Sequence, residues 1–201
     1  MKLLSATCIG TLIALTVTIT GATAAEEGHK EHGAHQHGHG TFEMAIEKGV
    51  VSIDLRAPGS DIVGFEHPAV SEADKKAIAD AKARLADPIG LFGIPKDAGC
   101  RVDTVDVHTH GADGDEDGEK AHKEDKATAK AEEAHSHKHS SFHAKYTLTC
   151  RTPQAIKSLD FAFFKAFPGA QELEVVAVSD KGQVKAEATR KTPKVALPAL
   201  W

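Results

Sequence analysis

Hydrophobic and polar residues alternate along much of residues 41–201, and this pattern predicts a domain built mainly from β-hairpins. The clearest hairpin folds at Lys48-Gly49, a two-residue loop whose glycine tolerates a positive φ. Pro58-Gly59 ends its second strand. Folding there puts three apolar pairs on one face: Phe42 with Leu55, Met44 with Ile53, and Ile46 with Val51.

One segment has helical periodicity instead. Ser71 is the expected N-cap, with Asp74 as its capping-box partner. Asp87-Pro88 ends the helix, because proline disfavours helical backbone in the residue before it. The apolar side of this helix comprises Ala77, Ile78, Ala81 and Leu85.

Two further strands, from Cys100 to Val107 and from Phe142 to Cys150, flank a long polar stretch. An antiparallel ladder that starts from Cys100 and Cys150 pairs Val102 with Leu148, Thr104 with Tyr146, and His108 with Phe142. Val105 and Val107 are out of phase with Val102 in this ladder, so a β-bulge or a shifted register stays open.

The C-terminal third is also rich in strand patterns. Residues 156–167 fit either an alternating strand (Leu159, Phe161, Phe163) or a helix (Ile156, Leu159, Phe163, Phe167). Glu172 to Ser179 reads as a central strand, and a three-residue loop, Asp180 to Gly182, returns Val184 opposite Val178 and Ala186 opposite Val176. Val195 to Leu197 is a further candidate for a short strand. The predicted fold is α+β: a sheet of mostly antiparallel hairpins with one main helix packed on it.

The N-terminus predicts export. An apolar run follows Met1-Lys2, and Ala22-Thr23-Ala24 provides a signal-peptidase site, so residues 1–24 are interpreted as a cleaved signal peptide. The rest is expected to be soluble, with no membrane span. Removing one lysine takes the formal charge from -5 to -6, which makes nucleic acid an unsuitable partner. The two remaining cysteines, Cys100 and Cys150, predict one disulfide in an exported chain.

Histidines are concentrated in the polar stretch from residue 108 to residue 143. Alanine is the only hydrophobic residue between Thr109 and Ser141, so we expect a disordered insert on a hairpin. Neutral imidazole favours zinc, copper and nickel, which makes the insert a candidate metal-binding segment. A solvated linker without metal chemistry is the alternative. The insert's candidate ligands are His108, His110, His122, His135, His137, His139 and His143, with Asp113, Asp115 and Asp117 as carboxylate candidates.

A second histidine cluster lies in residues 25–40, which we expect to form a flexible tail before a single domain at 41–201. Interspersed glycines let the backbone turn so that several imidazoles reach one ion. The alternative is a disordered, solubilising tail. Its candidate ligands are His29, His32, His35, His37 and His39. His67 lies among apolar residues before Pro68, a setting that favours a hydrogen-bonded structural histidine over a metal ligand. It is therefore a weaker ligand candidate.

Enzymatic signatures are missing from the sequence: there is no His-Glu-x-x-His, no Gly-x-Ser-x-Gly and no phosphate-binding glycine loop. A hydrolytic zinc enzyme also needs a rigid three-ligand site with an open position, whereas histidines in flexible segments provide binding and exchange. We therefore expect a metal-binding protein and not an enzyme.

Several features together resemble the ZrgA-type family of periplasmic zinc-binding proteins of Gram-negative bacteria. They are the signal peptide, the His-rich N-terminus, Gly64-Phe65-Glu66-His67, the Ala98-Gly99-Cys100 and Tyr146-to-Cys150 pair around a His/Asp loop, and Phe167-Pro168-Gly169. Asp61 departs from the asparagine expected before Ile62, a change that bears on a local turn and not on metal chemistry.

The resemblance implies a periplasmic protein that binds zinc ions and supports their import, as a scavenger or metallochaperone. It also implies a periplasmic component of a zinc uptake transporter as a partner. A periplasmic buffer that protects against excess zinc, copper or nickel is the alternative, because imidazole sites bind copper more tightly than zinc.

Overall fold

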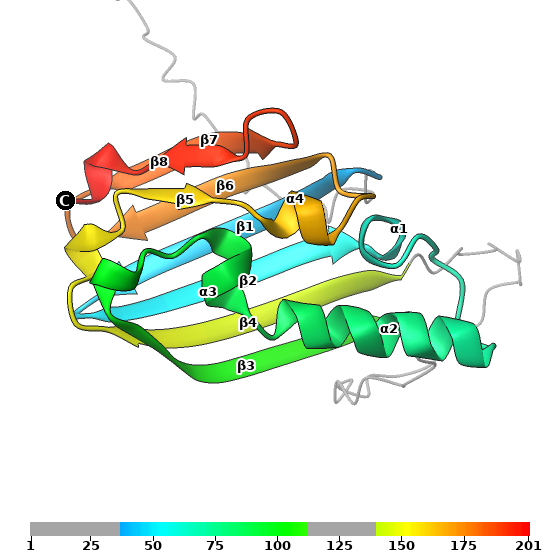
Figure 1. Cartoon of the computed structure of the whole chain (residues 1–201). Helices are drawn as coiled ribbons and strands as arrows, with labels where there is room; N and C mark the ends of the chain where they lie inside the picture. Colours follow the sequence, from blue (N-terminus) through cyan, green and yellow to red (C-terminus); the bar gives the residue numbers. More distant parts are fainter. Residues whose placement is uncertain (1–36, 112–139) are drawn as a thin grey trace, which may run out of the picture. The chain divides into compact units, whose positions relative to one another are not determined.

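The computed structural model describes residues 37–111 and 140–201, whose main element is a six-stranded sheet (Figure 1). The strand order is β3-β4-β2-β1-β6-β7. The strands are β1 (His39–Glu47), β2 (Val50–Pro58), β3 (Cys100–His110), β4 (Ser141–Cys150), β6 (Glu172–Ser179) and β7 (Gln183–Thr189). Every neighbouring pair is antiparallel except β1 and β6, which run parallel. The sheet is therefore mixed, and its parallel pair was not predicted.

The first hairpin has the predicted register. β1 and β2 pair Phe42 with Leu55, Met44 with Ile53 and Ile46 with Val51, and all six side chains are buried. Lys48 and Gly49 both have positive φ at the turn. β1 begins at His39, two residues before the expected start at Thr41, because those residues already pair with β6.

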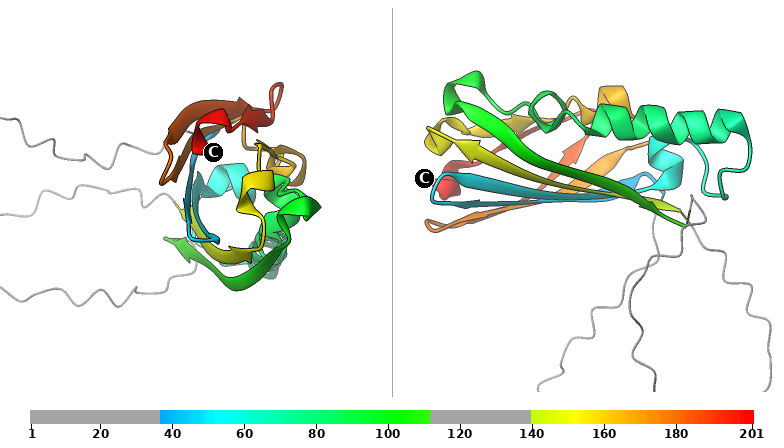
Figure 2. Two further views of the ribbon diagram at one scale, coloured as in Figure 1. Left: turned by 90° about the vertical axis from the view of Figure 1, so that its left-hand side faces the viewer. Right: turned by 90° about the horizontal axis from the view of Figure 1, so that it is seen from below.

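The inner face of the sheet is covered by helices and by a short two-stranded ribbon, around which the sheet curls (Figure 2). The α-helices are α1 (Gly59–Ile62), α2 (Glu72–Leu85), α3 (Pro88–Phe92) and α4 (Phe163–Ala166). The ribbon pairs β5 (Ser158–Asp160) with β8 (Lys194–Ala196). Three short 3-10 helices are η1 (Lys96–Ala98), η2 (Pro153–Ala155) and η3 (Pro198–Leu200). No helix in the described parts of the chain is both long and apolar enough to cross a membrane.

Helix α2 is the predicted main helix. Asp74 N donates to Ser71 Oγ at 3.1 Å and Ser71 N donates to Asp74 Oδ2 at 3.2 Å, which completes the capping box. Ile78, Ala81 and Leu85 are buried on its inner side, as predicted.

The core between the two layers is aromatic. The ring of Phe42 lies 4.8 Å from that of Phe92 and 5.1 Å from that of Phe161, both edge to face. Phe92 also meets Tyr146 at 5.7 Å. The buried hydroxyl of Tyr146 donates to the carbonyl of Leu85 at 2.9 Å, which ties the end of α2 to the middle of β4.

The C-terminal third differs from the prediction in two places. The ambiguous segment contains both elements, a short strand β5 followed by the single-turn helix α4. The β6–β7 register was predicted wrongly by one residue: Val178 pairs with Gln183, and Ala177 with Val184. The turn is Asp180-Lys181, because Gly182 already bonds to Ser179, and this register turns Val184 and Ala186 toward the inner face.

The β3–β4 ladder holds the predicted Cys100–Cys150 disulfide at one end. Val102 pairs with Leu148 as expected, but Asp103 is then left over in a β-bulge. Beyond the bulge Thr104 pairs with Thr147 and not with Tyr146. His108 consequently lies opposite His143, which corrects its predicted pairing with Phe142.

Candidate metal centre

The bulge decides which face of the sheet the β3 histidines occupy. Side chains alternate between the two faces of a strand, so an extra residue exchanges the inward and outward sets. Before the bulge, the even-numbered residues of β3 face the core, as Val102 does opposite the buried Leu148. After the bulge, the odd-numbered residues face the core. After the bulge, Thr109 is buried opposite Phe142, and His108 and His110 point outward. His143, between the buried Phe142 and Ala144, points outward on β4.

Three imidazoles meet on this outward face. One nitrogen from each of His108, His110 and His143 lies within 4.8 Å of the others. The ring centroids are 4.9 Å apart for His108 and His110, 5.0 Å for His108 and His143, and 6.0 Å for His110 and His143. All three sit on paired strands of one ladder, so their backbone positions are fixed by the sheet.

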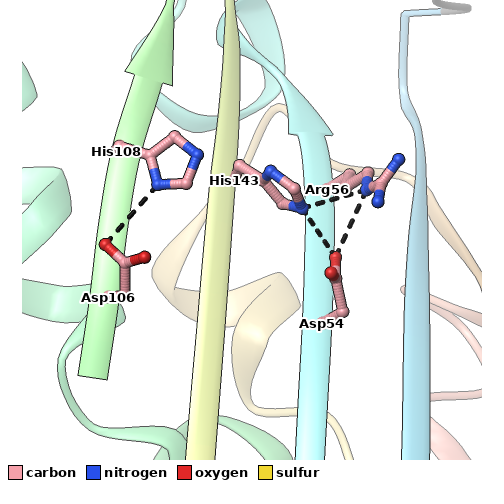
Figure 3. A network of polar contacts seen from close by, with 5 residues as sticks. All are labelled: Asp54, Arg56, Asp106, His108 and His143. Atoms are coloured by element: carbon pink, nitrogen blue, oxygen red, sulfur yellow. Dashed lines mark hydrogen bonds and ion pairs between the residues drawn. The ribbon is translucent and has the colours of Figure 1, made fainter. Parts of the chain in front are cut away.

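Two polar residues of β2 contact the ring of His143 (Figure 3). Oδ1 of Asp54 lies 2.8 Å from Nε2 of His143, and Nε of Arg56 lies 3.0 Å from the same nitrogen. Arg56 Nε also donates to Asp54 Oδ1 at 3.3 Å. These contacts arise because β2 pairs with β4 and brings Arg56 opposite His143.

The electrostatics of this group favour a neutral imidazole beside an ionised carboxylate. Burial lowers the pKa of His143, with Arg56 and His108 acting in the same direction, against the opposing effect of Asp54. Burial raises the pKa of Asp54, but its contacts with His143 and Arg56 outweigh burial and hold that pKa below its usual value. A neutral imidazole has the lone pair that a metal ion needs.

His108 has a weaker carboxylate neighbour. Oδ1 of Asp106, two residues earlier on β3, lies 3.5 Å from Nδ1 of His108 (Figure 3). That separation is an ion-pair distance and too long for a good hydrogen bond. Asp106 is also far more exposed than Asp54, with 68% of its side chain accessible against 25%.

The donor set fits zinc. Zinc takes imidazole nitrogens at about 2.0–2.1 Å in tetrahedral geometry, and three histidines leave its fourth position for water or another donor. Oxygen-preferring ions such as magnesium and calcium fit a three-nitrogen set poorly. Copper(II) and nickel(II) remain chemically compatible with it.

Other predicted ligands within the described residues lie elsewhere. His37 Nε2 contacts Glu66 Oε1 at 3.1 Å, and His39 Nδ1 contacts Glu172 Oε1 at 3.3 Å. The ring of His67 stacks on Phe65 at 4.6 Å, and its Nδ1 lies 3.0 Å from the carbonyl of Pro68. The remaining candidates, His29, His32, His35, His122, His135, His137, His139, Asp113, Asp115 and Asp117, lie outside the described residues.

Sequence reasoning missed Asp54 and Arg56. The alternation of β2 was the available signal, because buried Ile53 and Leu55 place Asp54 and Arg56 on the outward face. The β2–β4 pairing was the missing information. Without it, nothing linked these two residues to His143, which is 89 positions from Asp54.

The structure therefore places a candidate nitrogen-donor metal site, the outward histidine triad, on a disulfide-closed β-hairpin of the sheet. Residues 34–197 match the family described as ZrgA family zinc uptake protein, and the chain belongs to this family. A comparison with curated proteins finds no match.

Proposed function

We propose that this chain is a periplasmic zinc-binding protein that captures zinc ions for uptake, and that His108, His110 and His143 form its ordered zinc site. Membership of a zinc uptake family supports a role in zinc import. The convergence of three imidazoles on one sheet face is the observation that carries the assignment of the site.

The ordered site and the two histidine-rich segments have different roles in this proposal. The triad is held by paired strands, so little ordering entropy is lost when an ion binds. Residues 112–139 lie in the sequence between β3 and β4, the two strands that carry the triad, and contain His122, His135, His137 and His139. We propose that these histidines collect zinc and pass it to or from the triad, as expected of a scavenger or metallochaperone.

The disulfide and the N-terminal signal-like sequence support a place in the periplasm, which is an oxidising compartment. A periplasmic component of a zinc transporter is the proposed recipient of the metal.

We further propose binding without catalysis. The three-histidine set with an open fourth position is shared with catalytic zinc sites, so the argument from flexible histidines does not apply to the triad. The triad instead lies on an outward sheet face, and His110 is exposed. Catalytic sites enclose their substrate in a concave pocket, and an exposed face suits loading and release of an ion.

Zinc accumulation in living cells tests the function. A strain that lacks the gene, grown with a zinc chelator, is complemented with the wild-type chain or with a variant in which His108, His110 and His143 are all alanine. We expect the variant to accumulate no more zinc than the deletion strain. His67→Ala is the matched control, because it removes an imidazole outside the triad and should accumulate zinc as the wild type does.

Accumulation by the triple variant at the wild-type level would contradict the proposal. If the deletion strain instead took up zinc normally but became sensitive to excess metal, the buffering role would replace the uptake role.

A further inference from the structure

The two contacts that His143 Nε2 makes with β2 compete with one another. A carboxylate only accepts hydrogen bonds and a guanidinium only donates them. A neutral imidazole nitrogen either carries a hydrogen and donates or carries a lone pair and accepts. Asp54 at 2.8 Å and Arg56 at 3.0 Å therefore cannot both hydrogen-bond to Nε2 in the same tautomer.

Arg56 has a second acceptor, and this resolves the competition. When Nε2 carries the hydrogen it donates to Asp54, and Arg56 Nε donates to the same carboxylate oxygen at 3.3 Å. The carboxylate then accepts from both donors, and the remaining conflict is that the N–H of Arg56 lies close to the N–H of Nε2, with 3.0 Å between the two nitrogens. When Nε2 carries the lone pair it accepts from Arg56, but the carboxylate of Asp54 faces that lone pair at 2.8 Å. The second arrangement is electrostatically unfavourable.

We propose that Asp54 is a positioning residue that fixes the tautomer of His143, so that its Nδ1 is the atom that binds the metal ion. This inference rests on the proposed zinc site and adds which atom of His143 is the ligand. Nε2 points toward Asp54 and Arg56 on β2, whereas His108 lies on the other side of the ring on β3 (Figure 3). A carboxylate behind a metal-binding imidazole fixes the ring orientation and makes the ligand more basic.

The neighbouring strand provides a matched control. Asp106 is the aspartate nearest to His108, but its Oδ1 lies 3.5 Å from Nδ1, too far for a good hydrogen bond, and most of its side chain is in solvent. Asp106 and Asp54 are both aspartates on the outward face, so removing either takes away the same charge close to the triad. An effect of charge alone would appear in both variants, whereas an effect of the short hydrogen bond would appear only at Asp54.

The tautomer is observable directly in the metal-free protein. Long-range proton–nitrogen correlation spectra of the ¹⁵N-labelled full chain distinguish the Nε2–H and Nδ1–H forms, with the His143 signals assigned from their loss in His143→Gln. We expect the Nε2–H form for His143 and, once zinc is added, a coordination shift at Nδ1. An Nδ1–H form in the metal-free wild type, or a coordination shift at Nε2, would overturn the proposal without any positional variant.

Zinc affinity gives the second measurement. It is made in a full-length background in which His29, His32, His35, His122, His135, His137 and His139 are glutamine, so that the triad dominates, against a competing chelator. Asp54→Ala should weaken binding roughly 10–100-fold and shift His143 toward the Nδ1–H form, because Arg56 then donates to Nε2. Asp54→Asn retains an accepting oxygen and should keep the Nε2–H form with a smaller loss. Asp106→Ala should stay close to the background protein.

Equal losses for Asp54→Ala and Asp106→Ala, with an unchanged tautomer, would refute the positioning role. The failure of the proposed zinc site would look different. In that case His143→Gln would bind zinc as well as the background protein does, and zinc would leave the His143 ring signals unshifted.

Discussion

His108 lies directly opposite His143 across the β3–β4 ladder, although a regular ladder counted from the disulfide would have placed it opposite Phe142. The bulge at Asp103 accounts for the difference. The side chain of Asp103 accepts a hydrogen bond from the hydroxyl of Thr149 at 2.5 Å and lies 2.7 Å from the guanidinium of Arg101. One irregular residue thus turns two histidines from the core face to the outward face, where His143 already lies.

Deleting Asp103 should preserve the triad. The deletion makes the ladder regular and still pairs Val102 with Leu148 and His108 with His143. Zinc affinity should therefore stay close to that of the wild type, because the three imidazoles keep their places in the ladder. Competition titration of the deletion variant measures it. Asp103→Ala is the control, because it keeps the extra residue and removes only its side-chain contacts.

The deletion could instead abolish zinc binding while Asp103→Ala retained it. The pairing of His108 with His143 would then not be sufficient for the site. The added local twist that bulges produce would then be what brings the imidazoles together.

Asp61 should make the fold less stable at neutral pH than asparagine would. The residue is 3% exposed, its Oδ1 accepts from Gly38 N at 2.7 Å, and no partner is found for Oδ2 among the described residues. Burial raises the pKa of this carboxyl, despite its hydrogen bonds from Gly38 and Ser60. Its neutral form is therefore favoured in the folded state, and that stabilisation is lost as the pH rises from about 3.9 through the folded-state pKa.

Asp61→Asn mimics the neutral carboxyl at every pH and keeps an acceptor for Gly38. We expect it to raise the free energy of unfolding by about 1 kcal/mol at pH 7 and by little at pH 4. Urea unfolding at the two pH values tests this, with the exposed Asp80→Asn as control. A destabilised variant at pH 7 would show that the ionised carboxylate is the form the fold requires.

Local patterns predicted much of the fold. The β1–β2 register and the capped helix depend on neighbouring residues, so alternation and helical spacing were sufficient for both. The parallel pairing of β1 with β6 joins segments more than a hundred residues apart and has no local signal. The β6–β7 error shows that glycine was given too much weight as a turn signal, because the observed register pairs the partly buried Val184 and Ala186 with the buried Ala177 and Val175.

The site was predicted only in part, because residue types are visible in the sequence and long-range strand pairing is not. The residue types of His108, His110 and His143 marked them as ligands, but predicting their convergence required knowing that Asp103 bulges out of the ladder, which the sequence only left open. Asp54 and Arg56 became visible only with the pairing of β2 and β4.

Replacing residues 112–139 with a short Gly/Ser linker should separate the two classes of zinc site. The number of ions bound should fall by more than one, because His122, His135, His137 and His139 are removed together. The fold and the triad should persist, since closing a shorter loop changes the entropy only logarithmically, by about 0.6 kcal/mol per doubling of loop length. Calorimetric titration gives stoichiometry and affinity together. A variant that folds but has lost its tightest site would place that site in the replaced segment.

Anomalous X-ray diffraction at the zinc edge, from crystals of the chain grown with one equivalent of zinc, tests the central claim most directly. The account predicts one peak on the outward face of the β3–β4 ladder, about 2.0–2.1 Å from a nitrogen of each of His108, His110 and His143. A well-occupied zinc peak elsewhere, with the three imidazoles uncoordinated, would contradict it.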